Sequence, residues 1–347
     1  MSRQGSRSDT PSVPTIRDVA REAGVGVGTV ARVISGQGKV APATRSHVQA
    51  VIARMGYRPN PVAQALSRHR TDTLEVVVPL ITRDFYVEVL RGIEIALSNT
   101  RYSLLIRTIE RPGDRDGVFD ALARPGRADG AIIVSQAPTR ELLQRIAHDQ
   151  VPVVLVDGRH PALPGVAVDH EAAAATAVRH LIGLGHRRIA LVDHAVSAFA
   201  QGSPEGRRRG YHLALAEAGL PVEPANEIVA EFSPAGGEVA LRALLSQPQP
   251  PSALFVGSDR QASGIVAAAW RQGLHVPGDL AIVGYNDIDL AAYLDLTTMR
   301  VPMREMGERG VQMLLAALGG EAEAPAQVLL PAELVVRGSS GASGRAT

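Results

Sequence analysis

The sequence predicts an α/β fold with an N-terminal all-α head, and three observations support this prediction. Short amphipathic helices fill residues 15–60, whereas from residue 74 onward apolar runs alternate with helical stretches. Residues 1–70 hold 11 Lys or Arg against 3 Asp or Glu, and the remainder holds 25 against 32. The length of 347 residues is enough for two or three domains. A basic head on an acidic body is typical of a module that binds a polyanion.

The composition excludes several classes of protein. The chain has no cysteine, which excludes disulfides, Cys-based zinc sites and thiol chemistry. No apolar run approaches the ~18 residues of a membrane span, and residues 1–14 lack the apolar core of a secretory signal. We therefore expect a cytoplasmic protein with no membrane partner. The Ser/Pro/Arg-rich residues 1–14 predict a disordered tail.

Three helices are predicted in the head. Thr15 opens the first as an N-cap with Asp18 three residues on, in the pattern of a capping box. The second covers residues 27–34. Pro42 starts the third in its first turn, and Gly56 ends it.

The rest of the chain predicts parallel sheets. Apolar runs typical of buried strands lie at residues 74–78, 103–109, 130–134, 153–156, 189–192, 253–256 and 280–283. Helices are predicted at residues 86–98, 141–148, 172–184, 207–218, 235–245, 263–272 and 304–318. Alternation of strands and helices predicts doubly wound sheets. Because about 260 residues are more than one such sheet needs, we expect two lobes that face a cleft.

The glycine-rich segment at residues 26–31 admits two interpretations. Its G-x-G-x-x-A spacing matches the dinucleotide-binding pattern, which needs a preceding strand and an acidic residue about twenty positions later. An amphipathic helix precedes this segment instead, and no Asp or Glu occurs between Glu22 and Asp72. The nucleotide interpretation is therefore rejected.

Helix-turn-helix is the interpretation that fits this context. The second helix would expose Val27, Gly28, Thr29 and Arg32. Arg32 could donate two hydrogen bonds to guanine O6 and N7, and Val27 could touch a thymine methyl group. On these residues alone, a small structural bundle remains an open alternative.

Several short motifs then occur together: TIRDVA (15–20), AGV (23–25), RVI (32–34), GYRPN (56–60), VAQAL (62–66) and GYND (284–287). With these motifs the chain resembles the LacI/GalR family of bacterial transcriptional repressors over about residues 15–337. The resemblance implies a helix-turn-helix head, a hinge helix, and a core of two periplasmic-binding-protein-like lobes of doubly wound parallel sheet.

The resemblance also implies domain boundaries. The DNA-binding domain covers residues 15–60, the hinge and linker residues 61–72, and the core residues 73–337. Lobe one takes about residues 73–168 and 301–331, and lobe two takes about residues 169–300 and the C-terminal strand. Residues 338–347 are expected to form a loose tail.

On the DNA side, the resemblance assigns contacts to Thr15, Val27, Gly28, Thr29, Arg32, Asn60, Ala63 and Leu66. Leu66 would wedge between central base pairs from the minor groove, and Ala63 is small enough for close approach. The chain departs from the family at Gly26, Ala31 and Ser35, where Ser, Ser and Asn are usual. These departures predict fewer phosphate contacts and a softer reading helix.

In the cleft, the expected effector-binding residues are Phe85, Asp157, Asp169, Arg207, Phe232, Asp259 and Asn286. The three Asp residues and Asn286 follow predicted strands, at the sheet edge where α/β folds bind ligands, and they supply acceptors for a polyhydroxylated ligand. Each could instead be a helix cap or a loop residue. Arg207 matches the effector-binding Arg of the family, and Phe85 and Phe232 match positions that stack on ligands in relatives.

The resulting expectation is a sequence-specific repressor switched by a small molecule, a sugar or sugar derivative. Its partner would be a near-palindromic double-stranded operator, and because one head reads only a half-site, a homodimer is expected. The chain has no C-terminal heptad run, so no coiled-coil tetramer is expected. No cofactor is expected, and the ten scattered His do not predict a metal site.

Two rival classes of protein do not fit the sequence. A solute-binding protein that serves transport would carry a secretory signal and no helix-turn-helix, the reverse of this chain. A sugar-processing enzyme would need converging acid/base or nucleophilic residues. None of the motifs G-x-S-x-G, G-x-x-x-x-G-K-[ST] and H-E-x-x-H occurs, so no enzyme is expected.

Overall fold

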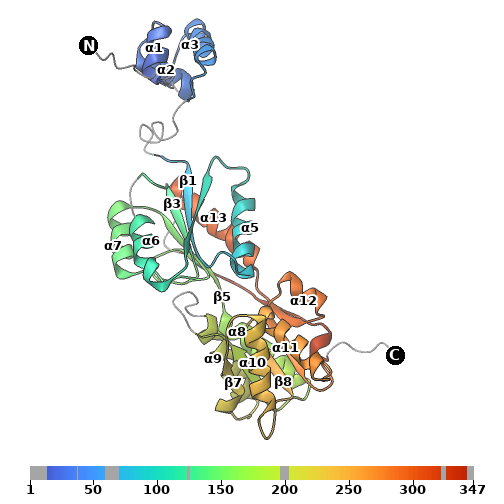
Figure 1. Cartoon of the computed structure of the whole chain (residues 1–347). Helices are drawn as coiled ribbons and strands as arrows, with labels where there is room; N and C mark the ends of the chain where they lie inside the picture. Colours follow the sequence, from blue (N-terminus) through green and yellow to red (C-terminus); the bar gives the residue numbers. More distant parts are fainter. Residues whose placement is uncertain are drawn as a thin grey trace, which may run out of the picture. The chain divides into compact units, whose positions relative to one another are not determined.

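The computed structural model describes residues 14–36, 38–58, 70–122, 126–195, 203–321 and 326–341. The chain divides into two compact units, Met1–Thr71 and Asp72–Thr347, called here the head and the core (Figure 1). Within the described residues, no helix combines the length and the hydropathy that a membrane crossing requires.

The head is a bundle of α1 (Ile16–Glu22), α2 (Val27–Ser35) and α3 (Pro42–Met55). The predicted capping box is present at α1, where the Asp18 backbone N–H donates to the Thr15 hydroxyl and the Thr15 N–H donates to Asp18 Oδ2 at 3.0 Å. Gly56 ends α3 in the left-handed conformation, with φ of 62°. The apolar faces of the three helices form a small core of Val19, Ala20, Ala23, Val30, Val33, Val48 and Val51.

The core holds one sheet in each lobe, and the prediction of doubly wound parallel sheets is confirmed. Within the described residues, lobe one has the strand order β11-β5-β4-β3-β1-β2 and lobe two the order β12-β10-β9-β8-β6-β7. Every pairing is parallel except that of β10 with β12. The strands of lobe one are β1 (Thr73–Pro79), β2 (Ser103–Ile109), β3 (Gly130–Val134), β4 (Val153–Val156), β5 (Gly165–Val168) and β11 (Gln327–Leu330). Those of lobe two are β6 (Ile189–Asp193), β7 (Glu227–Val229), β8 (Ala253–Val256), β9 (Ala281–Asn286), β10 (Thr297–Arg300) and β12 (Glu333–Val335).

Helices cover both faces of each sheet (Figure 1). In lobe one these are α5 (Asp84–Leu97) and α13 (Met303–Gly319) on one face, and α6 (Arg115–Leu122) and α7 (Arg140–Asp149) on the other. In lobe two they are α8 (His170–Gly183) and α9 (Ser203–Glu217) on one face, and α10 (Pro234–Leu245) and α11 (Asp259–Arg271) on the other. The short helix α12 (Asp289–Tyr293) and the 3₁₀ turns Pro112–Asp114, Pro224–Asn226 and Gly338–Ser340 complete the core.

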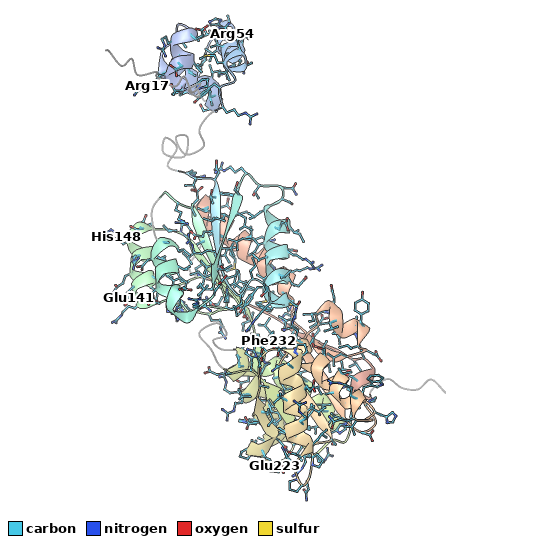
Figure 2. The ribbon with its side chains drawn as sticks, viewed as in Figure 1. Arg17, Arg54, Glu141, His148, Glu223 and Phe232 are labelled. Atoms are coloured by element: carbon cyan, nitrogen blue, oxygen red, sulfur yellow. The ribbon has the colours of Figure 1, made fainter. Side chains whose placement is uncertain are left out.

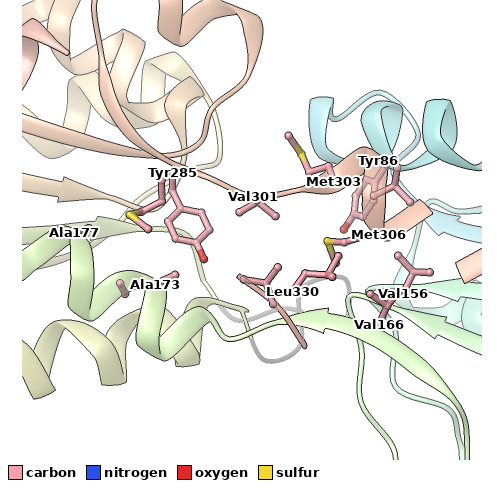
Figure 3. Packing of buried hydrophobic residues seen from close by; sticks show 14 of the residues in the cluster. Tyr86, Val156, Val166, Ala173, Ala177, Tyr285, Val301, Met303, Met306 and Leu330 are labelled. Atoms are coloured by element: carbon pink, nitrogen blue, oxygen red, sulfur yellow. The ribbon is translucent and has the colours of Figure 1, made fainter. Parts of the chain in front are cut away.

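The chain passes between the lobes three times, after β5, after β10 and after β11. One buried apolar cluster runs through both lobes and includes residues beside these crossings, such as Val301 and Leu330. Figure 3 shows Tyr285 and Ala177 on the lobe-two side of this cluster and Met306 on the lobe-one side. The two lobes therefore share a hydrophobic core at their junction.

The structure corrects some predicted elements. The C-terminal strand expected in lobe two is present as β12. The strands β5, β7, β10 and β11 were not predicted; they have only three or four residues each, and β7 and β11 lie at sheet edges. Helix α11 begins four residues earlier than predicted, since Ser258 caps it with a hydrogen bond from the Gln261 N–H. The expected loose tail is wrong for residues 338–340, where Ser339 is buried and its hydroxyl donates to the Ile282 carbonyl at 2.7 Å.

Candidate functional site

Helix α2 of the head presents the residues that the sequence analysis placed against DNA. Val27 is 42% exposed, Gly28 and Arg32 are exposed, and Thr29 is half-buried. The opposite face of α2 packs in the core of the head. The helix therefore exposes one face to solvent while its other face is held in the core of the head, as a helix that reads DNA requires.

Arg32 is the cation of this surface. Its Nε donates to the carbonyl oxygen of Gly28, one turn earlier, at 3.1 Å. Within the described residues it forms no ion pair, so its two Nη groups remain available as a donor fork for a base edge or a phosphate.

The N-terminus of α2 lacks a side-chain cap, since its N-cap is Gly26. The Thr29 N–H donates to the Gly26 carbonyl at 2.8 Å, and the N–H groups of Val27 and Gly28 can bind an anion such as a phosphate. The Thr15 hydroxyl is exposed but belongs to the α1 cap, where it donates to Asp18 Oδ2 at 2.6 Å. The predicted contacts Asn60, Ala63 and Leu66 lie outside the described residues.

A small cavity of about 50 Å³ lies between the two lobes of the core. Five of the seven predicted effector-binding residues line it: Phe85 and Asp157 from lobe one, and Arg207, Phe232 and Asn286 from lobe two. Phe232 lies at the edge of lobe two that faces lobe one (Figure 2). The cavity lies beside the carboxyl ends of β3, β4 and β9, where parallel sheets place their ligands.

Three residues that line this cavity have a strained backbone. Ser135, Asp157 and Asn286 each follow or end a strand and have positive φ values of 51°, 55° and 107°. Non-glycine residues rarely adopt this region, and such strain gathers at sites where side chains must be aimed in a fixed direction.

Asp157 is the centre of a hydrogen-bond chain that crosses between the lobes. Its Oδ2 accepts from the Ser135 hydroxyl at 2.6 Å, and its Oδ1 lies 3.0 Å from His170 Nε2. On the other side of the ring, His170 Nδ1 lies 2.7 Å from the Tyr285 hydroxyl. Burial raises the pKa of Tyr285, so that hydroxyl keeps its hydrogen. The His170 ring therefore links the Tyr285 hydroxyl of lobe two to the Asp157 carboxyl of lobe one.

Arg207 is held by a buried ion pair with Asp193 at the end of β6. The Nε and Nη2 atoms of Arg207 donate to the two carboxylate oxygens at 2.8 and 2.9 Å. Burial by itself raises the pKa of Asp193, but the Arg207 charge and the hydrogen bonds from Arg207 and His194 outweigh it and hold this pKa well below its ordinary value. The pair therefore stays charged, and Arg207 is fixed at the cavity wall with Nη1 unused within the described part of the chain.

Two contacts join the lobes next to the cavity. The Arg83 guanidinium of lobe one lies 4.5 Å from the centre of the Phe232 ring of lobe two, a cation–π contact. The next residue, Asp84, accepts two hydrogen bonds from Arg260 at the start of α11, one of them from Nη2 at 3.1 Å. The structure therefore shows the cleft in a closed arrangement.

Two predicted effector residues do not reach the cavity. Asp169 caps α8, accepting from the N–H groups of Glu171 and Ala172 at 3.1 and 3.0 Å. Asp259 is buried, with its oxygens accepting from the Thr298 hydroxyl at 2.6 Å and the Ile288 N–H at 2.9 Å. For both residues the structure therefore agrees with the alternative interpretation given above, a helix cap or a loop residue.

The cavity also has wall residues that the sequence analysis missed, namely Arg83, Tyr86, Ser135, His170, His194, Ser203 and Gly257. For some of them a signal existed. Ser135 directly follows a predicted strand, and His170 directly follows Asp169 at the crossing between the lobes. The positions that flank a strand end thus identify the cleft better than residue type alone.

Comparison with known proteins gives the same assignment over nearly the whole chain. Residues 15–60 match the family described as bacterial regulatory proteins, lacI family, and residues 178–340 match a periplasmic binding protein-like domain. Catabolite control protein A of Priestia megaterium is 34% identical over 330 residues, which cover 94% of this chain and 99% of that protein. The HTH-type transcriptional repressor CytR of Escherichia coli K12 is 33% identical over 334 residues, covering 94% of this chain and 96% of CytR.

Solved structures agree with these matches. The lac repressor dimer bound to operator and the anti-inducer ONPF has a TM-score of 0.83 at 28% identity, covering 95% of this chain and 99% of that one. The complex of the transcriptional regulator CelR with cellobiose has a TM-score of 0.69 at 30% identity, covering 94% and 99%. The names of these proteins confirm the expectation of a regulator and not an enzyme.

Proposed function

The chain belongs to the lacI family of bacterial regulatory proteins, and from this premise we propose that it is a repressor controlled by a sugar-type effector. In this proposal the head binds a near-palindromic operator in the bacterial cytoplasm. The effector, a sugar or a sugar derivative, binds between the lobes and changes the affinity for that operator.

The surface of α2 supports the DNA-binding half of the proposal. Arg32 would read a guanine through its free Nη groups, and Val27 would contact a thymine methyl group. The N–H groups at the start of α2 would bind a backbone phosphate. The resemblance assigns a further contact to Thr15 and, outside the described residues, contacts to Asn60 and Ala63 and the minor-groove wedge to Leu66.

The inter-lobe cavity is the strongest support for the effector half. Asp157 and Asn286 supply oxygen acceptors for hydroxyl groups, and Arg207 supplies a donor that is fixed by its ion pair. Phe85 and Phe232 supply apolar surface on either side. Few polar groups placed in an otherwise apolar site are typical of a pocket that binds a small polyhydroxylated molecule.

A homodimer would connect the two halves. One three-helix head covers a half-site, so a palindrome needs two copies related by a twofold axis. An effector that binds both lobes favours one arrangement of the lobes over another, and this changes the spacing of the two hinges. Binding of the effector thereby alters the affinity of the protein for the operator, and binding of the operator alters its affinity for the effector.

In vitro selection from a random duplex library tests this function. The full-length chain is used to enrich bound DNA, with and without a mixture of common sugars. The proposal predicts a palindrome enriched more strongly in one of the two conditions. Absence of an enriched sequence in both conditions would contradict the DNA-binding half, and equal enrichment would contradict the effector half.

A further inference from the structure

The central cavity is too small for the effector that it is proposed to bind. Its volume is about 50 Å³, whereas ligand pockets in proteins have about 300–1,000 Å³. A ligand larger than this cavity needs additional space next to it.

This space is present in a second cavity of about 660 Å³, called here the vestibule. It adjoins the central cavity, because Ser135, Asp157, His170 and Ser203 line both. Its own walls include Gln136 and Arg159 from lobe one and Ala172, Glu171 and Arg209 from lobe two.

The other side of the central cavity is closed. The contacts of Arg83 with Phe232 and of Asp84 with Arg260 join the lobes there. Asp84 and Arg260 line a different cavity of about 550 Å³, which shares no described residue with the central one. A further cavity of about 410 Å³ shares only His194 with the central one, whereas the vestibule shares four described residues with it. A ligand seated at Asp157 and Arg207 therefore has its most extensive adjoining space toward the vestibule while the lobes are closed.

The vestibule has unused hydrogen-bonding groups. Gln136 is 1% exposed, and its Nε2 donates to the Ser135 carbonyl at 3.0 Å, but its Oε1 accepts no hydrogen bond within the described residues. Arg159 is exposed and forms no ion pair there, and Arg209 uses only Nε, at 2.7 Å, on Glu171. These are one buried acceptor and several outward donors, which suit hydroxyl groups because a hydroxyl both donates and accepts.

The charges of the walls are balanced. The vestibule is lined by three arginines, Arg159, Arg179 and Arg209, and by three acidic residues, Asp157, Asp169 and Glu171. The lining therefore favours a neutral, hydroxyl-rich group over an anion or a cation.

We infer that the effector is a saccharide of at least two units, with its first unit in the central cavity and its second in the vestibule against Gln136, Arg159 and Arg209. This inference rests on the proposed function, since it extends the same cleft.

Isothermal titration calorimetry on the full-length chain tests the inference with matched saccharides. The panel contains glucose, galactose, mannose and xylose together with cellobiose, maltose, lactose, melibiose, mannobiose and xylobiose. We expect at least one disaccharide to bind at least about tenfold more tightly than either of its component sugars, because the second unit adds several hydrogen bonds.

A steric variant identifies where the second unit lies. Ala172 is an exposed position of α8 on the vestibule wall, so Ala172→Phe narrows the vestibule without entering the core. We expect this variant to remove the tenfold advantage of the disaccharide and to leave monosaccharide affinity within about twofold. Ala243→Phe, at an exposed position of α10, a helix with no residue in the vestibule lining, is the matched control and should change neither affinity.

The outcomes separate the inference from the function on which it rests. Equal affinity for a monosaccharide and its disaccharides, or an unchanged disaccharide advantage in Ala172→Phe, would overturn the second subsite and leave a sugar-binding cleft. Failure of every saccharide to bind would overturn the sugar-type effector itself, and the subsite with it.

Discussion

Arg32 is the residue of the head that should determine sequence preference. Its Nη groups have no protein partner in the described chain, and a bidentate contact with guanine contributes about 1–3 kcal/mol of discrimination. We expect Arg32→Ala to lose this free energy at one base pair of each half-site and little elsewhere. Fluorescence anisotropy with single-base operator variants measures this loss of binding free energy at each position. Uniform weakening on all sequences would make Arg32 a phosphate contact instead.

Asp259 should give the core an unusual dependence on pH. Burial raises the pKa of its carboxyl from 3.8 to about 7, so the folded protein retains a proton that the unfolded chain releases between these values. The free energy of unfolding should therefore fall as pH rises from about 4 to about 7, by at least about 1 kcal/mol from this group. In Asp259→Asn the group cannot titrate.

Urea unfolding at several pH values from 4.5 to 8 checks this prediction. The variant should gain stability relative to the unmodified protein as pH rises across that window. Parallel pH profiles of the two proteins would show that Asp259 ionises at its ordinary pKa. Asp193 does not interfere, because its pKa is lowered in the folded state and it is present in both proteins.

Single residues also show how far the sequence could predict the site. Strand ends and family likeness identified Asp157, Arg207 and Asn286 correctly as cavity residues. The same criteria selected Asp259, which braces a loop, and Asp169, which caps α8 and lines the vestibule but not the central cavity. A carboxylate at a strand end can face the cleft or the nearest backbone N–H, and only the local backbone direction decides which.

At the scale of elements, the packing of α5 on α13 depends on glycine. A Cβ atom at Gly92 would meet the backbone carbonyl of Arg304, which cannot move without displacing α13. We expect Gly92→Ala to lower the free energy of unfolding by about 1–3 kcal/mol. Gly117→Ala in α6 is the control: no atom lies within 4 Å of its Cβ position, so it should raise stability by about 0.5–1 kcal/mol.

Urea unfolding of both glycine variants measures this difference. Equal effects of the two substitutions would show that α5 and α13 have more room than the structure gives them.

Element positions were largely predictable here, because buried strands leave continuous apolar runs. The short edge strand β7 leaves none, so it could not be predicted.

At the scale of the whole molecule, Asp84 and Arg260 should stabilise the closed lobes. Their side chains are 34% and 42% exposed, so the pair contributes no more than about 1 kcal/mol. We expect Asp84→Asn to raise the open population by up to about fivefold, visible as a larger radius of gyration in small-angle X-ray scattering. Glu88→Gln is the control, since its partners Arg91 and Arg304 belong to the same lobe. An unchanged radius in Asp84→Asn would remove this role.

The central claim is that one ligand in the cleft changes the affinity of the head for DNA. The most direct test is the operator affinity of the full-length chain, measured by fluorescence anisotropy with and without a saturating saccharide that binds the core. The account predicts a change of at least about fivefold, the lower range of allosteric coupling, which Asp157→Asn strongly reduces. A saccharide that fills the cleft and leaves operator affinity unchanged would contradict it.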